Sequence, residues 1–299
     1  MSPELRADNL RGVVMMVIAV GSFALMDAAL KLLSPHYPPL QVAALRGYAS
    51  LPVVCVWILI LGRNARLLQV RWPLHVLRGV LGIVMMTAFT FALRTLPLSE
   101  AYAIFFVAPL IITALAAPLL GERVSANRWL AIVIGFAGVL IVFRPGGSHM
   151  LSLAALAVLL SAVCYAISAI SARILGRTDS SVAIVFWLMM SMALGATALT
   201  GSDWKPVQSE HAWLLVWIAV TGSIGQITIT EAFKRGQASL IAPFEYTALA
   251  WSLGLDWLVW KTLPQPVVLL GAAVVVGSGL FLLWSERRQP RPKATRESA

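Results

Sequence analysis

The chain has 299 residues, of which 59% are hydrophobic and only 12% are charged. A water-soluble domain carries roughly 45–50% apolar and about 25% charged residues, so this composition excludes an ordinary soluble fold. The formal net charge is +10, but the basic residues lie in short connectors and in the C-terminal tail and not on one amphipathic face, which argues against nucleic-acid binding.

Ten apolar stretches follow one another along the chain, each about 18–24 residues long, which matches the roughly 20 helical residues that cross a bilayer core. They lack the alternation of polar and apolar residues that membrane β-strands show. The sequence therefore predicts an all-α membrane protein with ten transmembrane helices. The stretches begin near Gly12, Leu40, Pro73, Leu98 and Ala126, and then near Met150, Ser180, His211, Ala238 and Gln265.

The two sets of five stretches are laid out alike, with offsets of 138, 140, 138, 140 and 139 residues between corresponding starts. A half with an odd number of crossings ends on the other side of the membrane, so the second half must be inverted. We expect residues 12–144 and 150–284 to form two inverted five-helix repeats around a central cavity, an arrangement typical of secondary transporters. Residues 1–11 are predicted to be a cytoplasmic N-terminus and residues 285–299 a disordered basic tail.

Lysine and arginine are distributed unevenly between the connectors, because one alternating set holds 16 of them and the other set holds 5. Basic connectors stay in the cytoplasm, so both termini are predicted to be cytoplasmic, which also requires an even number of crossings. The first apolar stretch continues from Gly12 to Leu33 without a small-residue cleavage site, so we expect it to remain as a membrane helix.

The sequence lacks the motifs that metal, nucleotide or covalent chemistry would need. There is no nucleotide-binding G-x-x-x-x-G-K-[ST] loop, so no ATPase subunit is expected. The two cysteines lie within apolar stretches, where cysteine is typically a small buried hydrophobe. We expect no catalytic residue, no metal and no cofactor. The four histidines do not show the spacing of metal ligands: His36, His75, His149 and His211.

An ionisable side chain at the bilayer centre costs about 2.5–3.5 kcal/mol, so each such residue needs a reason. Glu245 is the deepest, because it lies ten residues, or about 15 Å of helix, past Arg235. It either engages a substrate amine or a proton, or it is held neutral or paired to fix helix packing.

Asp27 and Arg46 enter from the outer half of the membrane. Asp27 lies four residues before Lys31, a spacing that allows an ion pair. Arg46 lies roughly 12 Å deep and needs a partner, for which Asp27 is a candidate. The two form either a structural pair or an outer gate with a carboxylate-binding arginine. Arg78 lies close enough to the cytoplasmic end of its stretch to snorkel to the surface.

Several motifs resemble a known family of membrane carriers. Residues 91–102 read FALRTLPLSEAY, and Ala108-Pro109 follows, with Leu120-Gly121-Glu122-Arg123 after the fourth stretch and Arg144-Pro145-Gly146 after the fifth. The second half contains Ala242-Pro243-Phe244-Glu245-Tyr246-Thr247, but Lys261-Thr262 stands at the counterpart of Gly121-Glu122. From Gly12 to Trp284 the chain resembles the EamA-type branch of the drug/metabolite transporter (DMT) superfamily.

The resemblance implies ten helices in two inverted repeats, with the first four of each half around a cavity. It is greatest to bacterial amino-acid exporters of the YddG type, which have broad, partly aromatic specificity. Asp27, Arg46 and Arg78 are then gate or ion-pair candidates. The candidates for substrate contact, each with helix or lipid packing as the alternative role, are Phe23, Tyr102, Phe105, Phe106, Tyr165, Gln226, Glu245, Tyr246 and Trp251.

The predicted function is a secondary transporter that exports amino acids, including aromatic ones, and related metabolites across the bacterial cytoplasmic (inner) membrane by alternating access. Its expected partners are the amino-acid substrate and the lipid bilayer, and the expected functional unit is a monomer. An uptake carrier for a larger metabolite such as S-adenosylmethionine is the alternative transport function. An intramembrane enzyme and a purely structural membrane scaffold are the alternatives from other classes.

Overall fold

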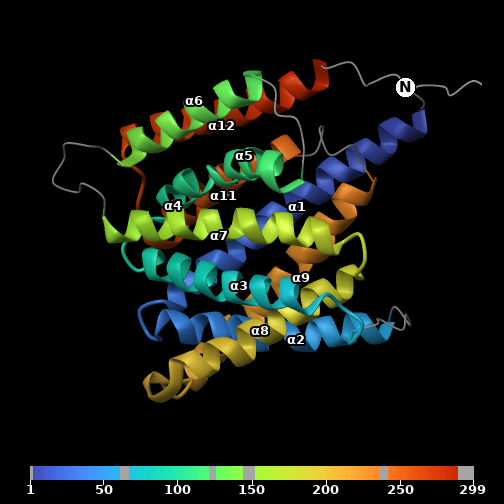
Figure 1. The fold of residues 1–299 in the computed structure, drawn as a ribbon. Coiled ribbons are helices and arrows are strands. Elements are labelled where there is room, and N and C mark those ends of the chain that lie inside the picture. Colours follow the sequence, from blue (N-terminus) through green and yellow to red (C-terminus); the bar gives the residue numbers. More distant parts are fainter. Residues whose placement is uncertain (1–2, 61–66, 121–125, 144–151, 236–241, 289–299) are drawn as a thin grey trace, which may run out of the picture.

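The computed structural model describes residues 3–60, 67–120, 126–143, 152–235 and 242–288. Every regular element in this part of the chain is a helix (Figure 1). The predicted Gly121-Glu122-Arg123 motif, the Pro145-Gly146 turn and the tail from residue 289 lie outside the described residues. The helices of the first half are α1 (Pro3–Leu33), α2 (Pro39–Ile60), α3 (Trp72–Leu93), α4 (Leu98–Phe105), α5 (Ala108–Leu120) and α6 (Ala126–Phe143).

The second half contains α7 (Leu153–Leu175), α8 (Ser181–Thr200), α9 (Ala212–Arg235), η3 (Ala242–Thr247), α11 (Ala248–Leu255), η4 (Asp256–Trp260) and α12 (Pro266–Arg288). Two single turns, η1 (Gly201–Asp203) and η2 (Ser209–His211), lie in the connector between α8 and α9. Helices α2, α3, α4, α6, α8, α9 and α12 begin within one residue of the starts that hydropathy predicts.

Local signals explain several of these starts. Ser152 and Ser180 precede α7 and α8, and each side-chain oxygen accepts a hydrogen bond from the backbone N–H three residues later. Such caps satisfy donors that have no partner within the helix. Pro73 occupies the first turn of α3, where its missing N–H costs nothing.

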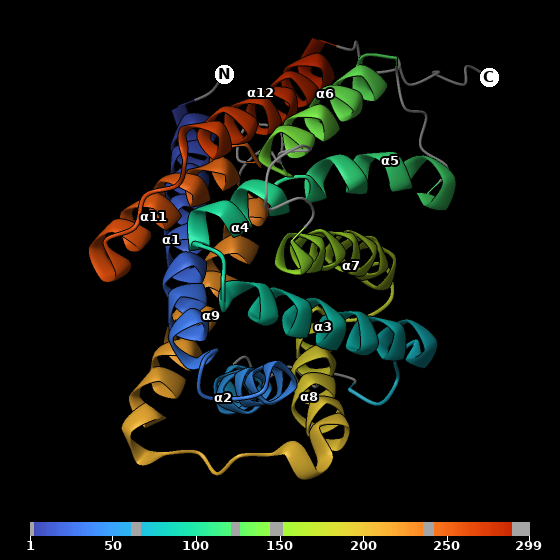
Figure 2. The same cartoon turned by 90° about the vertical axis from the view of Figure 1, so that its left-hand side faces the viewer.

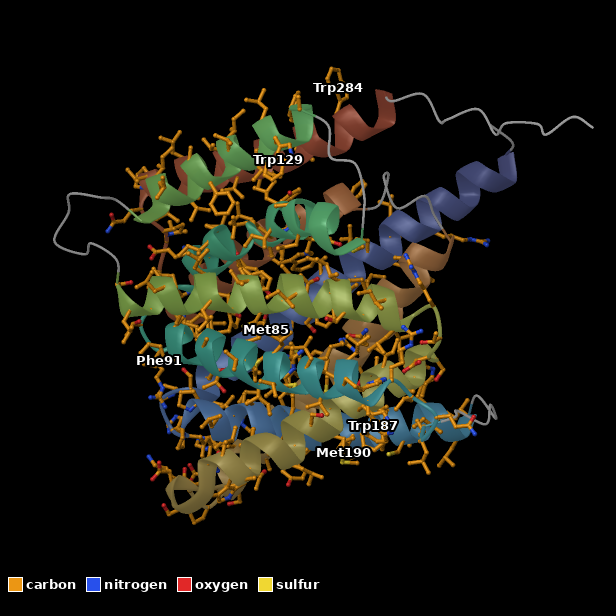
Figure 3. All side chains as sticks on the ribbon, viewed as in Figure 1. Met85, Phe91, Trp129, Trp187, Met190 and Trp284 are labelled. Atoms are coloured by element: carbon orange, nitrogen blue, oxygen red, sulfur yellow. The ribbon has the colours of Figure 1, made fainter. Side chains whose placement is uncertain are left out.

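Six helices within the described residues are long and apolar enough to cross a membrane. These are α1, α2, α3, α7, α8 and α9, and shorter apolar helices cover 98–112, 129–141 and 266–281. Trp129 of α6 and Trp284 of α12 lie in the outer layer, and about half of the surface of each residue is exposed (Figure 3). Met85, by contrast, lies inside the bundle between α3 and α7 (Figure 3). Exposed large apolar side chains on the outside of a helical bundle are expected of a protein surrounded by lipid.

The fourth and ninth apolar segments are not the continuous helices that hydropathy suggests. The fourth divides into α4 and α5 at Phe106 and Val107. Pro109 explains the break, because proline lacks an N–H and its ring clashes with the carbonyl four residues earlier, at Phe105. The ninth consists of a 3₁₀ helix that includes Pro243, a short α-helix and a π-helix.

The helices form a stack of layers, and each layer combines helices from both halves (Figures 1 and 2). Helix α6 packs on α12, α3 on α7, α2 on α8 and α1 on α9, while α4 contacts α11. We call the end of the bundle where α1 begins and α12 ends the terminal face, and the end where α1 finishes and α2 begins the opposite face (Figure 1).

Gly47 allows α2 to lie directly on α8. A Cβ atom at this position would lie 2.5 Å from the backbone nitrogen of Ala193 and 2.8 Å from the carbonyl oxygen of Met189. Because backbone atoms cannot move aside as a flexible side chain does, Gly47→Ala must separate the two helices.

We expect Gly47→Ala to lower the free energy of unfolding by about 1–3 kcal/mol, the usual cost of overpacking. Thermal unfolding of the purified protein in detergent measures this loss. Gly254→Ala is the matched control, because nothing lies within 4 Å of a Cβ atom there and alanine favours the helix. Equal melting temperatures for the two variants would contradict the proposed close contact.

Candidate functional site: the central cavity

A cavity of about 550 Å³ lies between the two halves of the chain. Its walls come from α1, α2, α3, α4, α5, α7, α8, α9, η3, α11 and α12. Both broken segments reach it, through Phe105, Phe106 and Pro109 of the fourth and through Glu245 and Tyr246 of the ninth. Irregular backbone at membrane depth is tolerated where it is buried in protein or lines a cavity, so the breaks and the cavity belong together.

The cavity occupies one face of α7. Ser161, Tyr165, Ser168, Ala169 and Ala172 line it, and this spacing follows a single face of an α-helix. Ala172 lies three residues from the end of α7 at the terminal face, whereas Ser161 lies eight residues from its start at the opposite face. Along α7 the cavity therefore extends closer to the terminal face.

Six aromatic rings form a belt on the cavity wall. The centroid of Phe89 lies 6.4 Å from that of Tyr102 and 5.8 Å from that of Phe105, which in turn lies 5.3 Å from Tyr165. Phe106 lies 6.1 Å from Tyr102 and extends the rings to Tyr246 at 5.3 Å. We call these residues, with Tyr246 as the sixth, the aromatic belt: Phe89, Tyr102, Phe105, Phe106, Tyr165 and Tyr246.

Asp27 and Arg46 both line the cavity, but they do not form the direct ion pair that we expected. The hydroxyl of Tyr102 donates a 2.6 Å hydrogen bond to Asp27 Oδ2. Arg46 Nη1 contacts the thioether of Met86 at 3.5 Å, and no Arg46–Asp27 pair within 4.0 Å occurs among the described residues. The expected Asp27–Lys31 pair is also replaced, since Lys31 lies 3.4 Å from Asp256.

Arg78 is buried at the cavity wall, with 8% of its surface exposed, so the expectation that it snorkels to the surface is not met. Its Nη1 donates a 3.2 Å hydrogen bond to the carbonyl oxygen of Ile184, and its Nε is buried without a hydrogen-bond partner. Packing against α8 keeps the side chain inside because the carbonyl that it reaches belongs to that helix.

Eight of the nine predicted substrate-contact residues line the cavity. The exception is Trp251, which lies against Gly21 of α1 and is 42% exposed. The rotation of α11 turns this side chain outward. The sequence did not predict two serines and five methionines of the cavity wall. Their only signal in the sequence was the clustering of methionines in α3 and α8. These wall residues are Ser161, Ser168, Met26, Met85, Met86, Met189 and Met192.

Polar contacts join the two halves at the opposite face. Tyr37 contacts His211 Nδ1 through its hydroxyl at 2.8 Å and accepts a 3.0 Å hydrogen bond from the Gln208 backbone. The amide of Gln41 makes a reciprocal pair of hydrogen bonds with the backbone of Lys205, at 2.6 and 2.9 Å. These contacts hold the α1–α2 turn against the α8–α9 connector.

Asp256 is a fully buried carboxylate at the same face that sequence analysis did not single out. It accepts hydrogen bonds from the backbone N–H groups of Leu98 and Ser99 and from the Ser99 hydroxyl, at 2.9, 2.7 and 2.6 Å. Lys31 completes its partners and also lies 4.3 Å from the centroid of the Trp260 ring. Asp256 therefore caps the first turn of α4 and ties it to α1 and η4.

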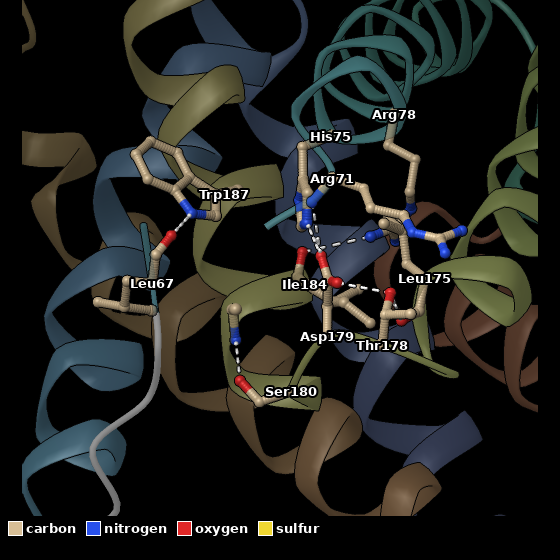
Figure 4. A network of polar contacts seen from close by, with 11 residues as sticks. Leu67, Arg71, His75, Arg78, Leu175, Thr178, Asp179, Ser180, Ile184 and Trp187 are labelled. Atoms are coloured by element: carbon tan, nitrogen blue, oxygen red, sulfur yellow. Dashed lines mark hydrogen bonds and ion pairs between the residues drawn. The ribbon is translucent and has the colours of Figure 1, made fainter. Parts of the chain in front are cut away.

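At the terminal face, Asp179 connects α3 to the turn between α7 and α8 (Figure 4). Its Oδ2 lies 2.8 Å from His75 Nε2 and accepts a 3.2 Å hydrogen bond from the Arg71 backbone N–H, while Thr178 donates to Oδ1 at 2.7 Å. Burial alone would raise the pKa of Asp179, but the hydrogen bonds from Thr178, His75 and Arg71 together lower it below its usual 3.8.

We expect Asp179→Asn to destabilise the protein by about 1.5–3 kcal/mol at neutral pH, the usual value of hydrogen bonds to a charged group. The folded-state pKa is lowered, so this stabilisation is complete above the unfolded pKa and is lost as pH falls through the folded pKa. Thermal unfolding should separate wild type from the variant at about pH 7, and the difference should disappear towards about pH 3. A difference that does not depend on pH would contradict the role of the carboxylate.

Among the described residues, no group of three or more His, Cys, Asp or Glu side chains could hold a metal ion.

Two segments of the chain, residues 10–144 and 152–284, each match the EamA-like transporter family. The pseudopaline exporter of Pseudomonas aeruginosa is 27% identical over 267 residues, which is 89% of this chain and 93% of that protein. The S-adenosylmethionine uptake transporter of Rickettsia prowazekii is 25% identical over 285 residues, with 95% and 96% covered. The riboflavin transporter of Vibrio cholerae is 26% identical over 292 residues, with 96% and 98% covered.

A solved crystal structure shares the fold, with a TM-score of 0.64 and 20% identity over 95% of this chain and 98% of that one. The family match covers nearly the whole chain, and the apolar helices agree with a multi-pass membrane protein. On this evidence the protein is a member of the EamA-like transporter family of the DMT superfamily.

Proposed function

We propose that this protein is a ten-span secondary transporter that exports amino acids, including aromatic ones, and related metabolites by alternating access. The observation that carries the proposal is the content of the central cavity, where Asp27, Glu245, Arg46 and Arg78 occur beside the aromatic belt. Intramembrane charges are expensive and mark substrate or ion pathways.

The ten spans comprise α1, α2, α3, α4 with α5, α6, α7, α8, α9, η3 with α11 and η4, and α12. In the order of the spans, α1, α2, α3 and α6 of the first half correspond to α7, α8, α9 and α12 of the second half. If corresponding helices are exchanged, the α1–α9 contact becomes the α7–α3 contact, and the α2–α8 and α6–α12 contacts are unchanged. This self-consistent pairing, together with the two family matches, supports two repeats related by a pseudo-two-fold axis. The repeats correspond to residues 12–144 and 150–284.

The terminal face is assigned to the cytoplasm of a bacterial cell, with both chain ends there. Support comes from the charge distribution along the sequence, since the alternating set of connectors that includes the two chain ends holds 16 lysines and arginines and the other set holds 5. The cavity extends towards this face, and the contacts of Tyr37, Gln41 and Asp256 join the halves at the outer face. A cytoplasmic amino acid would therefore enter this conformation, and breaking the outer contacts would release it outside.

The wall chemistry matches a zwitterion with a variable side chain. A guanidinium such as Arg46 binds a carboxylate, and Asp27 or Glu245 attracts an ammonium group. The rings of the aromatic belt stack on flat or apolar side chains. Methionines on α1, α3 and α8 add a surface that adapts to different shapes, which favours broad specificity. The functional unit in this proposal is a monomer, because both halves of the cavity come from one chain.

Proteoliposomes test the proposal. Vesicles containing the purified protein should release preloaded labelled phenylalanine, leucine and methionine faster than empty vesicles, with and without a pH gradient. A pH-dependent rate would assign proton coupling to the cavity carboxylates. Folded protein that moves none of these amino acids faster than empty vesicles would refute the proposal.

Uptake of a larger metabolite is a second candidate function, favoured by the size of the cavity. About 550 Å³ lies within the range of pockets that hold drug-sized ligands. Relatives named for S-adenosylmethionine and riboflavin transport cover nearly the same length of chain. Unlabelled S-adenosylmethionine or riboflavin can be added as a competitor while the flux of labelled phenylalanine is measured. Only transport of a larger metabolite predicts that these competitors strongly inhibit the phenylalanine flux.

A further inference from the structure

Two arginines line the central cavity, and within the described residues no Asp or Glu side chain lies within 4.0 Å of either. A guanidinium has five N–H donors and remains charged in proteins. A buried charge is strongly destabilising unless a partner compensates it. Arg46 and Arg78 therefore offer the cavity more donor capacity than the protein itself uses.

The contacts of Arg46 are weak. Its Nη1 meets the thioether sulfur of Met86 at 3.5 Å, and sulfur is a poor acceptor. The nearby acid of the cavity, Asp27, is engaged by the Tyr102 hydroxyl at 2.6 Å. An anionic group of a ligand would supply the charge-assisted hydrogen bonds that this guanidinium lacks.

Arg78 is the second anion-binding group. It makes one hydrogen bond, from Nη1 to the Ile184 carbonyl, and its buried Nε has no partner. The side chain is more than nine-tenths buried and forms part of the cavity wall (Figure 4 shows it against α8). A structural arginine at this depth would be expected to meet a carboxylate of the chain, and the described residues provide none.

The two guanidiniums enter from opposite ends of the cavity. Arg46 lies seven residues after the start of α2 at the opposite face, and Arg78 lies six residues after the start of α3 at the terminal face. At 1.5 Å per residue, the Arg46 backbone lies about 10.5 Å and the Arg78 backbone about 9 Å from the start of its helix, within a hydrocarbon core of roughly 30 Å. About 10 Å of membrane depth then separates their backbones, so the two sites are distinct.

We propose that the preferred substrates are amino acids with a second carboxylate at the end remote from the α-carboxylate. Arg46 binds the α-carboxylate and Arg78 the distal one, with the amine facing Asp27 or Glu245. Arg78 is thus a specificity-determining residue. This inference rests on the proposed amino-acid transport and ranks extended amino dicarboxylates above neutral and aromatic amino acids within its broad substrate range.

Matched substrate pairs test the inference in proteoliposomes. Glutamate and glutamine have nearly the same shape and differ in the distal charge, as do 2-aminoadipate and 2-aminohexanoate at greater length. We expect the KM of each diacid to be about 10- to 100-fold lower than that of the amino acid without the distal charge. Hydrogen bonds to a charged group stabilise binding by about this factor. Equal KM values within both pairs would overturn the inference but leave the proposed function intact.

Arg78→Gln should abolish the preference, so that the KM for glutamate equals that for glutamine, whereas Arg46→Gln should raise both KM values and keep their ratio. Arg177→Gln in the exposed α7–α8 turn is the control and should change neither. If Arg78→Gln fails to fold, Arg78→Lys, which keeps the charge but loses the planar fork, should show an intermediate preference. An undiminished preference in either Arg78 variant would overturn the inference, and the absence of flux for every amino acid would refute the proposed function itself.

Discussion

Asp256→Ala should lower the stability of this protein more than any other single substitution of a polar residue considered above. The carboxylate is fully buried, and it accepts three hydrogen bonds from Leu98 and Ser99 while pairing with Lys31. Its removal leaves the Lys31 ammonium without its partner and two N–H groups of α4 without an acceptor. Removal of one member of such a buried pair typically costs about 3–5 kcal/mol.

Thermal unfolding in detergent measures the loss, and Asp203→Ala, an exposed aspartate in η1, is the matched control. The double variant Lys31→Met with Asp256→Asn should recover part of the stability, since it removes both charges together. A melting temperature for Asp256→Ala equal to that of the Asp203→Ala control would contradict the role of Asp256.

Ala169→Trp should reduce substrate flux to the level of empty vesicles while leaving the protein folded. Ala169 lies in the middle of the α7 face that lines the cavity, between Tyr165 and Ala172. An indole at this position points into open space and not into packed core, so its cost in stability is small, but it fills the route between the two faces.

Leu160→Trp on the same helix is the control, because Leu160 is 49% exposed on the outside of the bundle. Flux of labelled phenylalanine should be unchanged in this variant, and the melting temperatures of both variants should stay near that of wild type. If Ala169→Trp transports at the wild-type rate, the substrate does not pass through this cavity.

Helix positions were predictable from sequence because their causes are local. Apolar stretches of membrane-spanning length predicted seven helix starts to within one residue. One local signal was misjudged in the fourth segment, where Pro109 follows the break between α4 and α5 although the apolar composition suggested a continuous span. The ninth segment also differs from a continuous α-helix, since it begins with a 3₁₀ helix that contains Pro243. The break at Pro109 follows from the steric rule for proline, so it was present in the sequence.

What the sequence determined by itself was the succession of apolar helices and the uneven distribution of charge, since both depend on position along one chain. Tertiary structure decided which groups meet. Asp27 binds Tyr102 and not Lys31, and Lys31 pairs with an aspartate 225 residues away. Helix rotation turned Trp251 outward and Arg78 inward, because the direction of a side chain within a bundle depends on which neighbouring helix its own helix packs against.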